Sequence, residues 1–333
     1  MSLMAAEARE APQAVARFLA RNAVALAELG QRLRRQGPPV VLTSARGSSD
    51  HAAGYFKYLC EIVLGVPCAS VGASVVSVYG AQLKAASALC ITISQSGQSP
   101  DILALQDEAK ASGAISVAIV NNENSPAARH ADICLALHAG EERSVAATKT
   151  FIASCAAGAA IVAHWSGDKA LLTGLDRLPE TLGRAASLSW NGFTDFARDA
   201  ESLYVLGRGP SLPIAQETAL KLKETCAIHA EAYSVAEVMH GPWEIMESGF
   251  PVLVYAPDDA ARPTTREAIE KMRRAGADLR VVGDGLPMAD SGHPLLDPLA
   301  IVQTAYLEIE RLAATLGRDP DRPRLLKKVT ETL

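Results

Sequence analysis

The sequence predicts an α/β protein made of two tandem domains, each a doubly wound parallel sheet. Apolar runs of strand length alternate with segments of helical periodicity along most of the 333 residues, which is typical of parallel sheets covered by helices. The two halves also resemble each other at an offset of 162 residues. Arg46-Gly47-Ser48-Ser49 matches Arg208-Gly209-Pro210-Ser211, each after a strand-like run. We therefore expect two copies of one domain.

The expected elements follow the chain in a regular order. The predicted segments are a helical arm at 1–35, a first domain at 36–170, linker helices at 171–197, a second domain at 198–318 and a polar tail at 319–333. The predicted strands of the first domain are Val40–Ser44, Leu89–Ser94, Ile115–Val120 and Ile133–Leu137. Those of the second domain are Leu203–Leu206, Val252–Tyr255 and Leu279–Val282.

Composition and charge exclude several classes of protein. The formal net charge is −5, aromatic residues make up 5% of the chain, and the longest basic tract is Arg32-Leu33-Arg34-Arg35, so nucleic acid is not an expected partner. Glu7 and Arg9 stand where a signal peptide needs an apolar core. The apolar run from Ile152 to His164 is too short to span a bilayer. These features predict a cytoplasmic protein with no membrane partner.

Cysteine and histidine spacing predicts neither a metal nor a cofactor. The six cysteines are scattered, mostly in apolar runs, and indicate small buried side chains in a reducing compartment. The seven histidines show no metal-ligand spacing. Gly207-Arg208-Gly209 begins a dinucleotide fingerprint, but Leu212 stands where its third glycine is required. Nicotinamide and flavin are therefore not expected.

A turn rich in hydroxyl groups follows one predicted strand of the first domain. Ser94-Gln95-Ser96-Gly97-Gln98-Ser99 separates an apolar run from a helical pattern at 101–112. Unpaired N–H groups and the helix dipole attract an anion there, and the serines add uncharged donors. Serine is also the preferred N-cap, so a single turn of this kind is compatible with an ordinary cap. Because a second such turn, Gly47-Ser48-Ser49, follows another strand, we predict a phosphate site.

The second domain lacks this turn and carries titratable residues instead. On the predicted helix Ile214–Thr225, the residues Glu217, Lys221 and Glu224 share one face. A solvated Glu–Lys face is the common explanation of this spacing, but the neighbouring residues are mostly apolar, so we expect buried charges. His240 precedes Gly-Pro on a predicted sharp turn. A desolvated Glu224 and an imidazole suit proton transfer between C1 and C2 of a sugar.

Four motifs in this order resemble tandem sugar isomerase (SIS) domains. They are Ser94-Gln95-Ser96-Gly97, Leu220-Lys221-Leu222-Lys223-Glu224, His229-Ala230-Glu231-Ala232-Tyr233 and His240-Gly241-Pro242. The sequence closely resembles the isomerase half of the glutamine–fructose-6-phosphate aminotransferases. The likeness includes Glu7 to Pro12 and the tail through Lys328, so it covers nearly the whole chain. It implies two flavodoxin-like, three-layer α/β/α domains.

The resemblance also implies roles for particular residues. The expected phosphate contacts are Ser48, Ser49, Ser94, Gln95, Ser96 and Ser99. Glu224 is expected to carry the proton between C1 and C2, with Lys221 and Glu217 beside it. His240 is expected to open the sugar ring from the neighbouring subunit of a homodimer with shared active sites. Lys328 matches a tail lysine that forms a Schiff base with the open ketose, although Lys327 is adjacent. The expected sugar-lining loop consists of Ala146, Ala147 and Thr148.

We expect no glutaminase domain of the aminotransferase kind, since none of the cysteines precedes Cys60. The expected activity is therefore that of SIS-type glucosamine-6-phosphate deaminases, which form fructose 6-phosphate and ammonia. The alternatives are a fructosamine-6-phosphate deglycase, an isomerase of another sugar or amino-sugar phosphate, and a non-catalytic regulator that binds a sugar phosphate. Two observations argue against a regulator. Regulators of this kind usually carry a DNA-binding helix-turn-helix, and the residues from Ala14 to Arg35 are too short and too acidic for one. A protein that only binds its ligand also needs no base such as Glu224.

Overall fold

The computed structural model describes residues 1–246, 248–326 and 328, which form two compact units. The five-stranded unit contains Gln13–Glu142 and Lys149–Pro179. The four-stranded unit contains Met1–Pro12, Arg143–Thr148 and Glu180–Lys328. Residues 143–148 lie inside the range expected for the first domain, yet they pack with the four-stranded unit. The start of the chain does the same.

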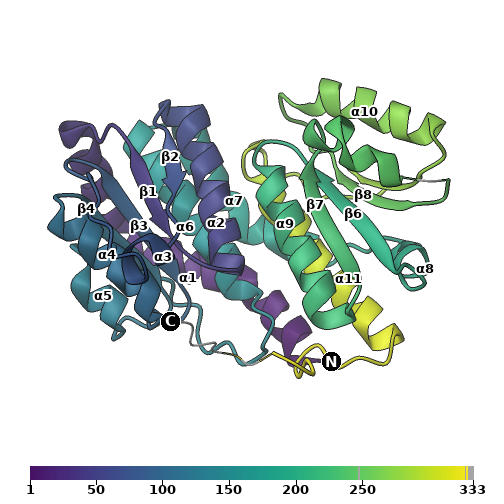
Figure 1. The fold of residues 1–333 in the computed structure, drawn as a ribbon, viewed down its shortest axis with the longest axis horizontal. Coiled ribbons are helices and arrows are strands. Elements are labelled where there is room, and N and C mark those ends of the chain that lie inside the picture. The colour runs from purple at the N-terminus through teal and green to yellow at the C-terminus, as the bar shows by residue number, and fades with distance from the viewer. Residues whose placement is uncertain (247, 327, 329–333) are drawn as a thin grey trace. The chain divides into compact units, whose positions relative to one another are not determined.

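The five-stranded sheet is parallel throughout, in the order β2-β1-β3-β4-β5 (Figure 1). Its strands are β1 (Val41–Ser44), β2 (Cys68–Ser70), β3 (Leu89–Ser94), β4 (Ile115–Val120) and β5 (Ile133–Ala136). Every residue of β4 is buried, as expected for a central strand with helices on both faces of the sheet. This strand order is one of the two common doubly wound arrangements.

The helices of this part of the chain include the crossover connections between consecutive strands that parallel pairing requires, and others that precede β1 or follow β5. They are α1 (Leu3–Gln36), α2 (Ser48–Leu59), α3 (Ser74–Ser77), α4 (Pro100–Ala111), α5 (Pro126–His130), α6 (Lys149–Ser166) and α7 (Lys169–Ala185), with a π-helical turn, η1 (Cys60–Leu64), after α2. The alanine-rich α6 is buried along almost its whole length and packs against α2.

Among the described residues, no helix combines the length and the hydropathy that crossing a membrane requires.

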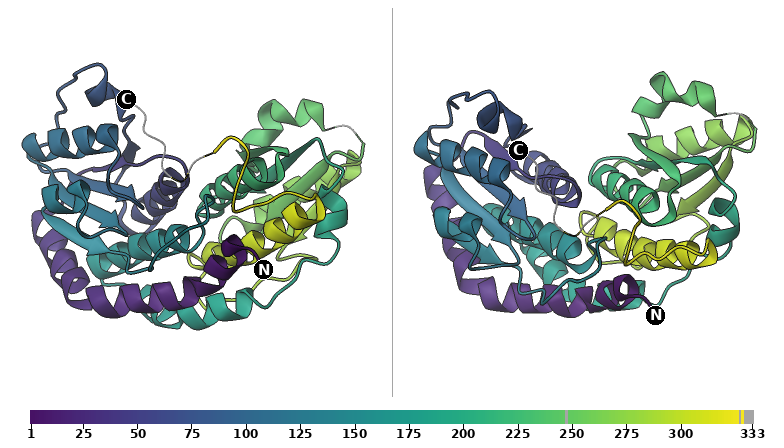
Figure 2. Two further views of the ribbon diagram at one scale, coloured as in Figure 1. Left: turned by 90° about the horizontal axis from the view of Figure 1, so that it is seen from below. Right: turned by 60° about the horizontal axis from the view of Figure 1, so that its bottom comes forward.

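The four-stranded sheet is also parallel, in the order β7-β6-β8-β9. Its strands are β6 (Ser202–Gly207), β7 (His229–Ser234), β8 (Pro251–Tyr255) and β9 (Asp278–Val282). Its helices are α8 (Phe193–Ala197), α9 (Ser211–Lys221), the π-helical turn η2 (Leu222–Cys226), the 3₁₀ turns η3 (Glu237–His240) and η4 (Pro242–Ile245), α10 (Arg262–Arg274) and α11 (Asp297–Thr315). The first turns of α1 lie along α11, purple and yellow in Figure 2, where Gln303 Nε2 donates to the Ala8 carbonyl at 2.9 Å.

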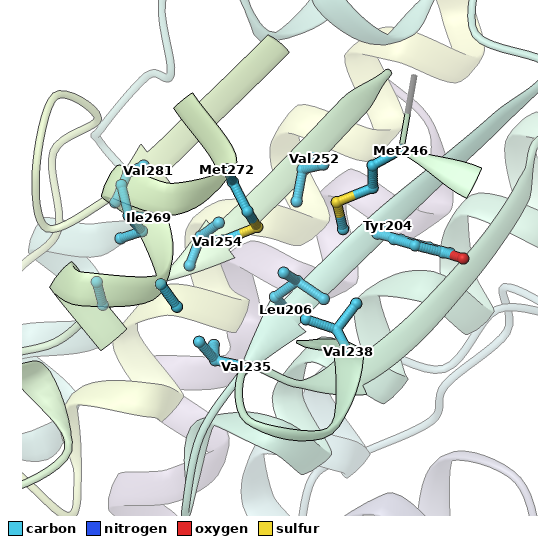
Figure 3. Close-up of a cluster of buried hydrophobic side chains, with 12 residues drawn as sticks. Tyr204, Leu206, Val235, Val238, Met246, Val252, Val254, Ile269, Met272 and Val281 are labelled. Atoms are coloured by element: carbon cyan, nitrogen blue, oxygen red, sulfur yellow. The ribbon is translucent and has the colours of Figure 1, made fainter. Parts of the chain in front are cut away.

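One face of the four-stranded sheet packs against α10 through an apolar cluster. Figure 3 shows Leu206 of β6 and Val254 of β8 in this cluster with Ile269 and Met272 of α10. All four side chains are almost completely buried. Burying such a side chain stabilises a fold by about 1.5–3 kcal/mol. The cluster therefore holds β6 in place, and α9 begins just after the end of β6.

The two units repeat each other in geometry as well as in sequence. β3 and β8 begin 162 residues apart, and so do α4 and α10. The π-helical turns η1 and η2 obey the same offset. Each is followed by a residue with left-handed backbone, Gly65 (φ 66°) in one unit and Ala227 (φ 53°) in the other. The repeat predicted from the arginine–glycine motifs therefore extends through the strands, the helices and an unusual turn.

The predicted fold class is confirmed, and each predicted strand is found with its ends within one residue of the prediction. The strands β2 and β7 were not predicted. Both lie at a sheet edge, where one side of the strand has no neighbour, so neither carries a long apolar run. The helix expected at Ile214–Thr225 begins earlier, at Ser211, and changes to π geometry at Leu222.

Candidate active site

The two serine-rich turns follow neighbouring strands at the carboxyl edge of the five-stranded sheet. Ser44 at the end of β1 is in register with Thr92 of β3. From β1 the chain passes through α2 to β2 on one side, and from β3 it passes through α4 to β4 on the other. The edge between β1 and β3 is therefore a topological switch point, which is where open α/β sheets bind ligands.

Backbone geometry shapes the second of these turns. The Gly97 N–H donates to Ser94 Oγ at 3.0 Å, which closes the turn at the end of β3. Gly97 has a φ of 63°, a left-handed conformation that favours glycine. A Cβ atom at this position would lie only 2.2 Å from Ser125 Oγ. Both the conformation and the close approach therefore require glycine here.

All the predicted phosphate ligands lie at this switch point and are at least partly exposed. Ser48 and Ser49 begin α2, Ser94 ends β3, Gln95 and Ser96 follow it, and Ser99 precedes α4. Each of the two helices is 12 residues long, and its dipole places a partial positive charge at this end. An ion pair between Arg46 and the buried Asp101 ties the first turn to the start of α4. This arrangement suits the recognition of a phosphate group.

In the four-stranded unit, three charged side chains and a tyrosine form a network. Lys221 Nζ lies 3.5 Å from Glu217 Oε1 and also contacts Glu224 Oε2. Tyr306 of α11 donates its hydroxyl proton to the same Glu217 oxygen at 2.9 Å. Glu217 and Lys221 are closed to solvent, as their apolar neighbours led us to expect, whereas the Glu224 side chain is 21% exposed.

The network keeps Lys221 in its charged form. Burial alone would lower the pKa of this lysine, but the charges of Glu217 and Glu224 outweigh that effect and raise its pKa. Lys221 is therefore an ammonium group at neutral pH. Lys221 contacts Glu224, so its positive charge lies beside the Glu224 carboxylate, the one carboxylate of the network that solvent reaches.

The helix changes to π geometry at the place where Glu224 lies. Thr225 Oγ1 donates to the Lys221 carbonyl at 2.8 Å, and Ala227 ends the turn in a left-handed conformation. A π-helical turn contains more residues than an α-helical one, so it alters the directions of the side chains that follow; such turns are frequent at functional sites. This geometry accounts for a partly exposed Glu224 one turn after a buried Lys221.

Glu224 lines a pocket of about 640 Å³, a volume within the usual range of small-molecule sites. Its lining consists of Lys223, Glu224, Thr225, Ala227, Gly317, Arg318, Asp319, Arg322, Pro323, Arg324, Leu325 and Leu326. Four of these side chains are cationic, and two are acidic. The pocket thus combines one carboxylate suited to proton transfer with an environment that attracts anions.

The structure brings Lys328 to the loop predicted to line the sugar. Its Nζ donates to the Ser144 carbonyl at 2.5 Å. Further along this loop, Ala146 and Thr148 are buried and Ala147 is partly exposed. Lys327, the other lysine considered, lies outside the described residues.

His240 ends η3 with an exposed side chain, as predicted for a histidine before Gly-Pro. It is not among the described residues that line the Glu224 pocket. Within the part of the chain that the structure describes, no group of three or more histidine, cysteine or carboxylate side chains is arranged to hold a metal ion.

Two residues that lie near the candidate site were not assigned a role in it from the sequence. Tyr306 reaches Glu217 from 89 positions away, and no local spacing connects them. Glu7 accepts hydrogen bonds from the 143–148 loop. A weak signal for Glu7 was present, since it shares a helix face with Met4 and Ala11, both of which are completely buried.

Comparison with known proteins places these features in a family. The SIS domain family matches residues 38–164 and 197–286, more than half of the chain. Over 308 residues the chain is 32% identical to the isomerising glutamine–fructose-6-phosphate aminotransferase of Zymomonas mobilis, covering 85% of this chain and 50% of that protein. The chain therefore spans about half the length of this relative.

Solved structures extend the likeness over nearly the whole chain. The C-terminal domain of glucosamine-fructose-6-phosphate aminotransferase from Francisella tularensis aligns with a TM-score of 0.84 and 26% identity, covering 97% of this chain and 98% of that one. A crystal structure from Silicibacter pomeroyi, whose description as a phosphosugar isomerase is provisional, aligns with a TM-score of 0.93 and 44% identity, covering 96% and 100%. The chain therefore belongs to the SIS domain family, with one match in each half of the repeat.

Proposed function

We propose that this protein is a phosphosugar isomerase that deaminates its substrate, converting glucosamine 6-phosphate and water into fructose 6-phosphate and ammonia. The observation that carries the proposal is the placement of Lys221 between Glu217 and Glu224, of which only Glu224 lines the pocket. The serine turns at the switch point supply a site for the 6-phosphate. Similarity to isomerising aminotransferases supports an amino-sugar phosphate as the ligand.

Ring opening is the first step of the proposed reaction. His240, contributed by the neighbouring subunit of a homodimer, accepts the proton of the O1 hydroxyl and returns a proton to the ring oxygen. The bond between C1 and the ring oxygen breaks, which leaves an open-chain aldehyde with an amine at C2. The exposed position of His240 outside the described lining of the Glu224 pocket supports a role in a partner's site.

Proton transfer between the two carbons follows. The Glu224 carboxylate removes the proton from C2 and delivers it to C1, and one proton of the C2 amine passes to O1, so the aldehyde becomes an alcohol and C2 becomes an imine. The Lys221 ammonium holds the Glu224 carboxylate in place during this transfer. Lys328 then adds its amine to C2 and ammonia leaves. Water hydrolyses the resulting lysine imine, which releases fructose 6-phosphate and balances the reaction.

The proposal is tested by incubating the purified protein with glucosamine 6-phosphate in the absence of glutamine. Fructose 6-phosphate and ammonia are measured in the same samples, and the Glu224→Gln variant serves as the inactive control. We expect both products in equal amounts. If neither forms although glucosamine 6-phosphate binds, the deaminase assignment is wrong. A wider panel of sugar phosphates is then tested for binding and for turnover. If some of them bind and none is converted, the protein is a regulator and not an enzyme.

A fructosamine-6-phosphate deglycase is the second candidate, favoured by the charge of the pocket. Lys223, Arg318, Arg322 and Arg324 line the Glu224 pocket, and because the phosphate is assigned to the serine turns, these cations are left for another anionic group. A substrate whose amine carries an acidic substituent would use them. Water would then convert it into glucose 6-phosphate and the free substituted amine, so the identity of the sugar product distinguishes this reaction from deamination.

A further inference from the structure

The first turns of α1 hold the loop at 143–148 through a buried carboxylate. Glu7 is 5% exposed and accepts hydrogen bonds from the N–H groups of Arg143 at 2.5 Å and of Ser144 at 3.1 Å. A buried carboxylate is costly unless donors surround it, and hydrogen bonds to a charged acceptor are among the stronger kinds. Glu7 therefore fixes the backbone of this loop.

Ser144 connects Glu7 to the lysine of the tail. Its N–H donates to Glu7 Oε2, and its carbonyl accepts from Lys328 Nζ at 2.5 Å. One residue thus joins the two side chains through the two polar groups of its own backbone. Any movement of the loop at Ser144 moves the acceptor that holds Lys328.

The tail has a second attachment to the start of α1. The N–H groups of Leu3 and Met4 donate to the two carboxylate oxygens of Asp321 at 2.6 and 2.8 Å. These groups belong to the first turn of the helix, where N–H groups have no partner within the helix. Asp321 lies seven positions before Lys328 in the tail. We call Leu3, Met4 and Glu7 the amino-terminal clamp.

We propose that the amino-terminal clamp positions Lys328 for covalent capture of the sugar, with Glu7 acting through Ser144 and the helix start acting through Asp321. This inference rests on the proposed function, because it assigns a role to the lysine of that mechanism. Glu7 is a positioning residue, since it touches the loop and not the reacting atoms. A displacement of about 1 Å at a reacting group lowers a rate by up to roughly 100-fold.

The covalent step can be measured directly. The Lys328 amine adds to the C2 carbonyl of open-chain fructose 6-phosphate and water leaves, which forms an imine. Borohydride supplied in the experiment reduces this imine by hydride transfer, and solvent supplies the proton. The stable product carries the mass of the sugar phosphate less one oxygen atom. Intact-protein and peptide mass spectrometry give its yield and its position.

The test compares Glu7→Gln with Glu10→Gln, an exposed carboxylate one turn further along α1. Glutamine keeps the size of Glu7 but loses its charge and one acceptor oxygen. We expect Glu7→Gln to lower kcat and the adduct yield roughly 10- to 100-fold with an unchanged KM. Glu10→Gln should match the wild type. Thermal unfolding and fructose 6-phosphate binding by calorimetry establish that each variant is folded.

The outcomes separate this inference from the proposed function. If the wild type forms an adduct at Lys328 and Glu7→Gln forms it equally well, the clamp has no positioning role. If the wild type forms no adduct, the lysine step of the proposed function is wrong, and the clamp proposal is wrong with it. If Glu7→Gln does not fold, Asp321→Asn decides, because it weakens only the second attachment. An unchanged adduct yield in that variant overturns the proposal.

Discussion

Lys221 Nζ lies 3.5 Å from Glu217 Oε1, and both side chains are almost completely removed from solvent. Each group has lost its hydration, so each depends on the other for compensation. Tyr306 adds one hydrogen bond to the carboxylate, and Glu224 adds a second contact to the ammonium. A buried pair of this kind contributes little net stability when intact, but its disruption is costly because one charge is left without a partner.

Replacing Lys221 with methionine should therefore destabilise the protein strongly. The substitution leaves the Glu217 carboxylate buried beside an apolar side chain, at an expected cost of about 3–5 kcal/mol in the free energy of unfolding. Urea denaturation measures this loss. The matched control is Arg273→Met, which breaks an exposed ion pair with Glu270 and should cost at most about 1 kcal/mol. Equal losses in the two variants would contradict the account of the buried pair.

The raised pKa of Lys221 predicts how the stability of the wild type depends on pH. A lysine whose pKa is higher in the folded state contributes stability fully below its unfolded value of 10.5 and loses it as the pH rises through the folded value. The reference is the double variant Glu217→Gln/Lys221→Met, which lacks both charges. The difference in unfolding free energy between wild type and reference should stay constant from about pH 8 to 10 and shrink above pH 10.5. A difference that shrinks below pH 9 would show that Lys221 titrates lower than expected.

Glu224→Gln should abolish turnover and leave ligand binding intact. Glutamine preserves the size of the side chain but cannot accept a proton from C2, and loss of a general base costs roughly 100- to 10,000-fold in rate. Calorimetry with fructose 6-phosphate should give a dissociation constant within about twofold of the wild type, because the phosphate ligands are unaltered. Glu267→Gln, an exposed carboxylate on α10, is the control and should keep full activity. Full activity in Glu224→Gln would remove this residue from the mechanism.

Much of the fold could be predicted from the sequence because its central strands are buried on both faces. Ile115–Val120 is apolar or small at every position, and the structure buries each of these residues in β4. β7 could not be recognised in this way. It carries His229, Glu231 and Tyr233 at a sheet edge, and its pairing with β6 is decided by the folded sheet and not by its own composition.

The candidate site shows the same division between local and distant relationships. Glu217, Lys221 and Glu224 could be placed together because their spacing on one helix fixes their direction. The π-helical turn at Leu222 was not predictable, since no residue type marks it. The contacts of Tyr306 with Glu217 and of Glu7 with Ser144 join segments far apart in the chain, and only tertiary packing brings them within hydrogen-bond distance.

Gly97→Ala tests whether the turn after β3 binds the phosphate. The new Cβ would lie 2.2 Å from Ser125 Oγ and would force the turn to move. We expect KM for phosphorylated ligands to rise at least about tenfold, the effect of losing one good hydrogen bond to a charged group. The control is Gly140→Ala, where φ is 76° and no atom lies within 4 Å of the new Cβ, so backbone strain is matched without the clash. Equal KM values in the two variants would place the phosphate elsewhere.

The proposed contribution of His240 from a partner subunit predicts complementation between two inactive variants. Glu224→Gln and His240→Ala should each be inactive as homodimers, because every site lacks either its base or its ring-opening group. In a mixed dimer, one site combines both substitutions and the other is intact, since each site takes Glu224 from one subunit and His240 from the other. Random exchange of equal amounts should restore about one quarter of the wild-type activity, because half of the dimers are mixed and each has one working site.

The complementation is measured after the two variants are mixed under mildly denaturing conditions and returned to buffer, with each variant treated alone as the control. Native mass spectrometry of differently tagged chains gives the fraction of mixed dimers, so the recovered activity can be compared with the number of intact sites. Recovery in proportion to that fraction supports a shared site. If mixed dimers form and stay inactive, His240 acts within the same subunit as Glu224, because a site built from one chain always contains one of the two substitutions.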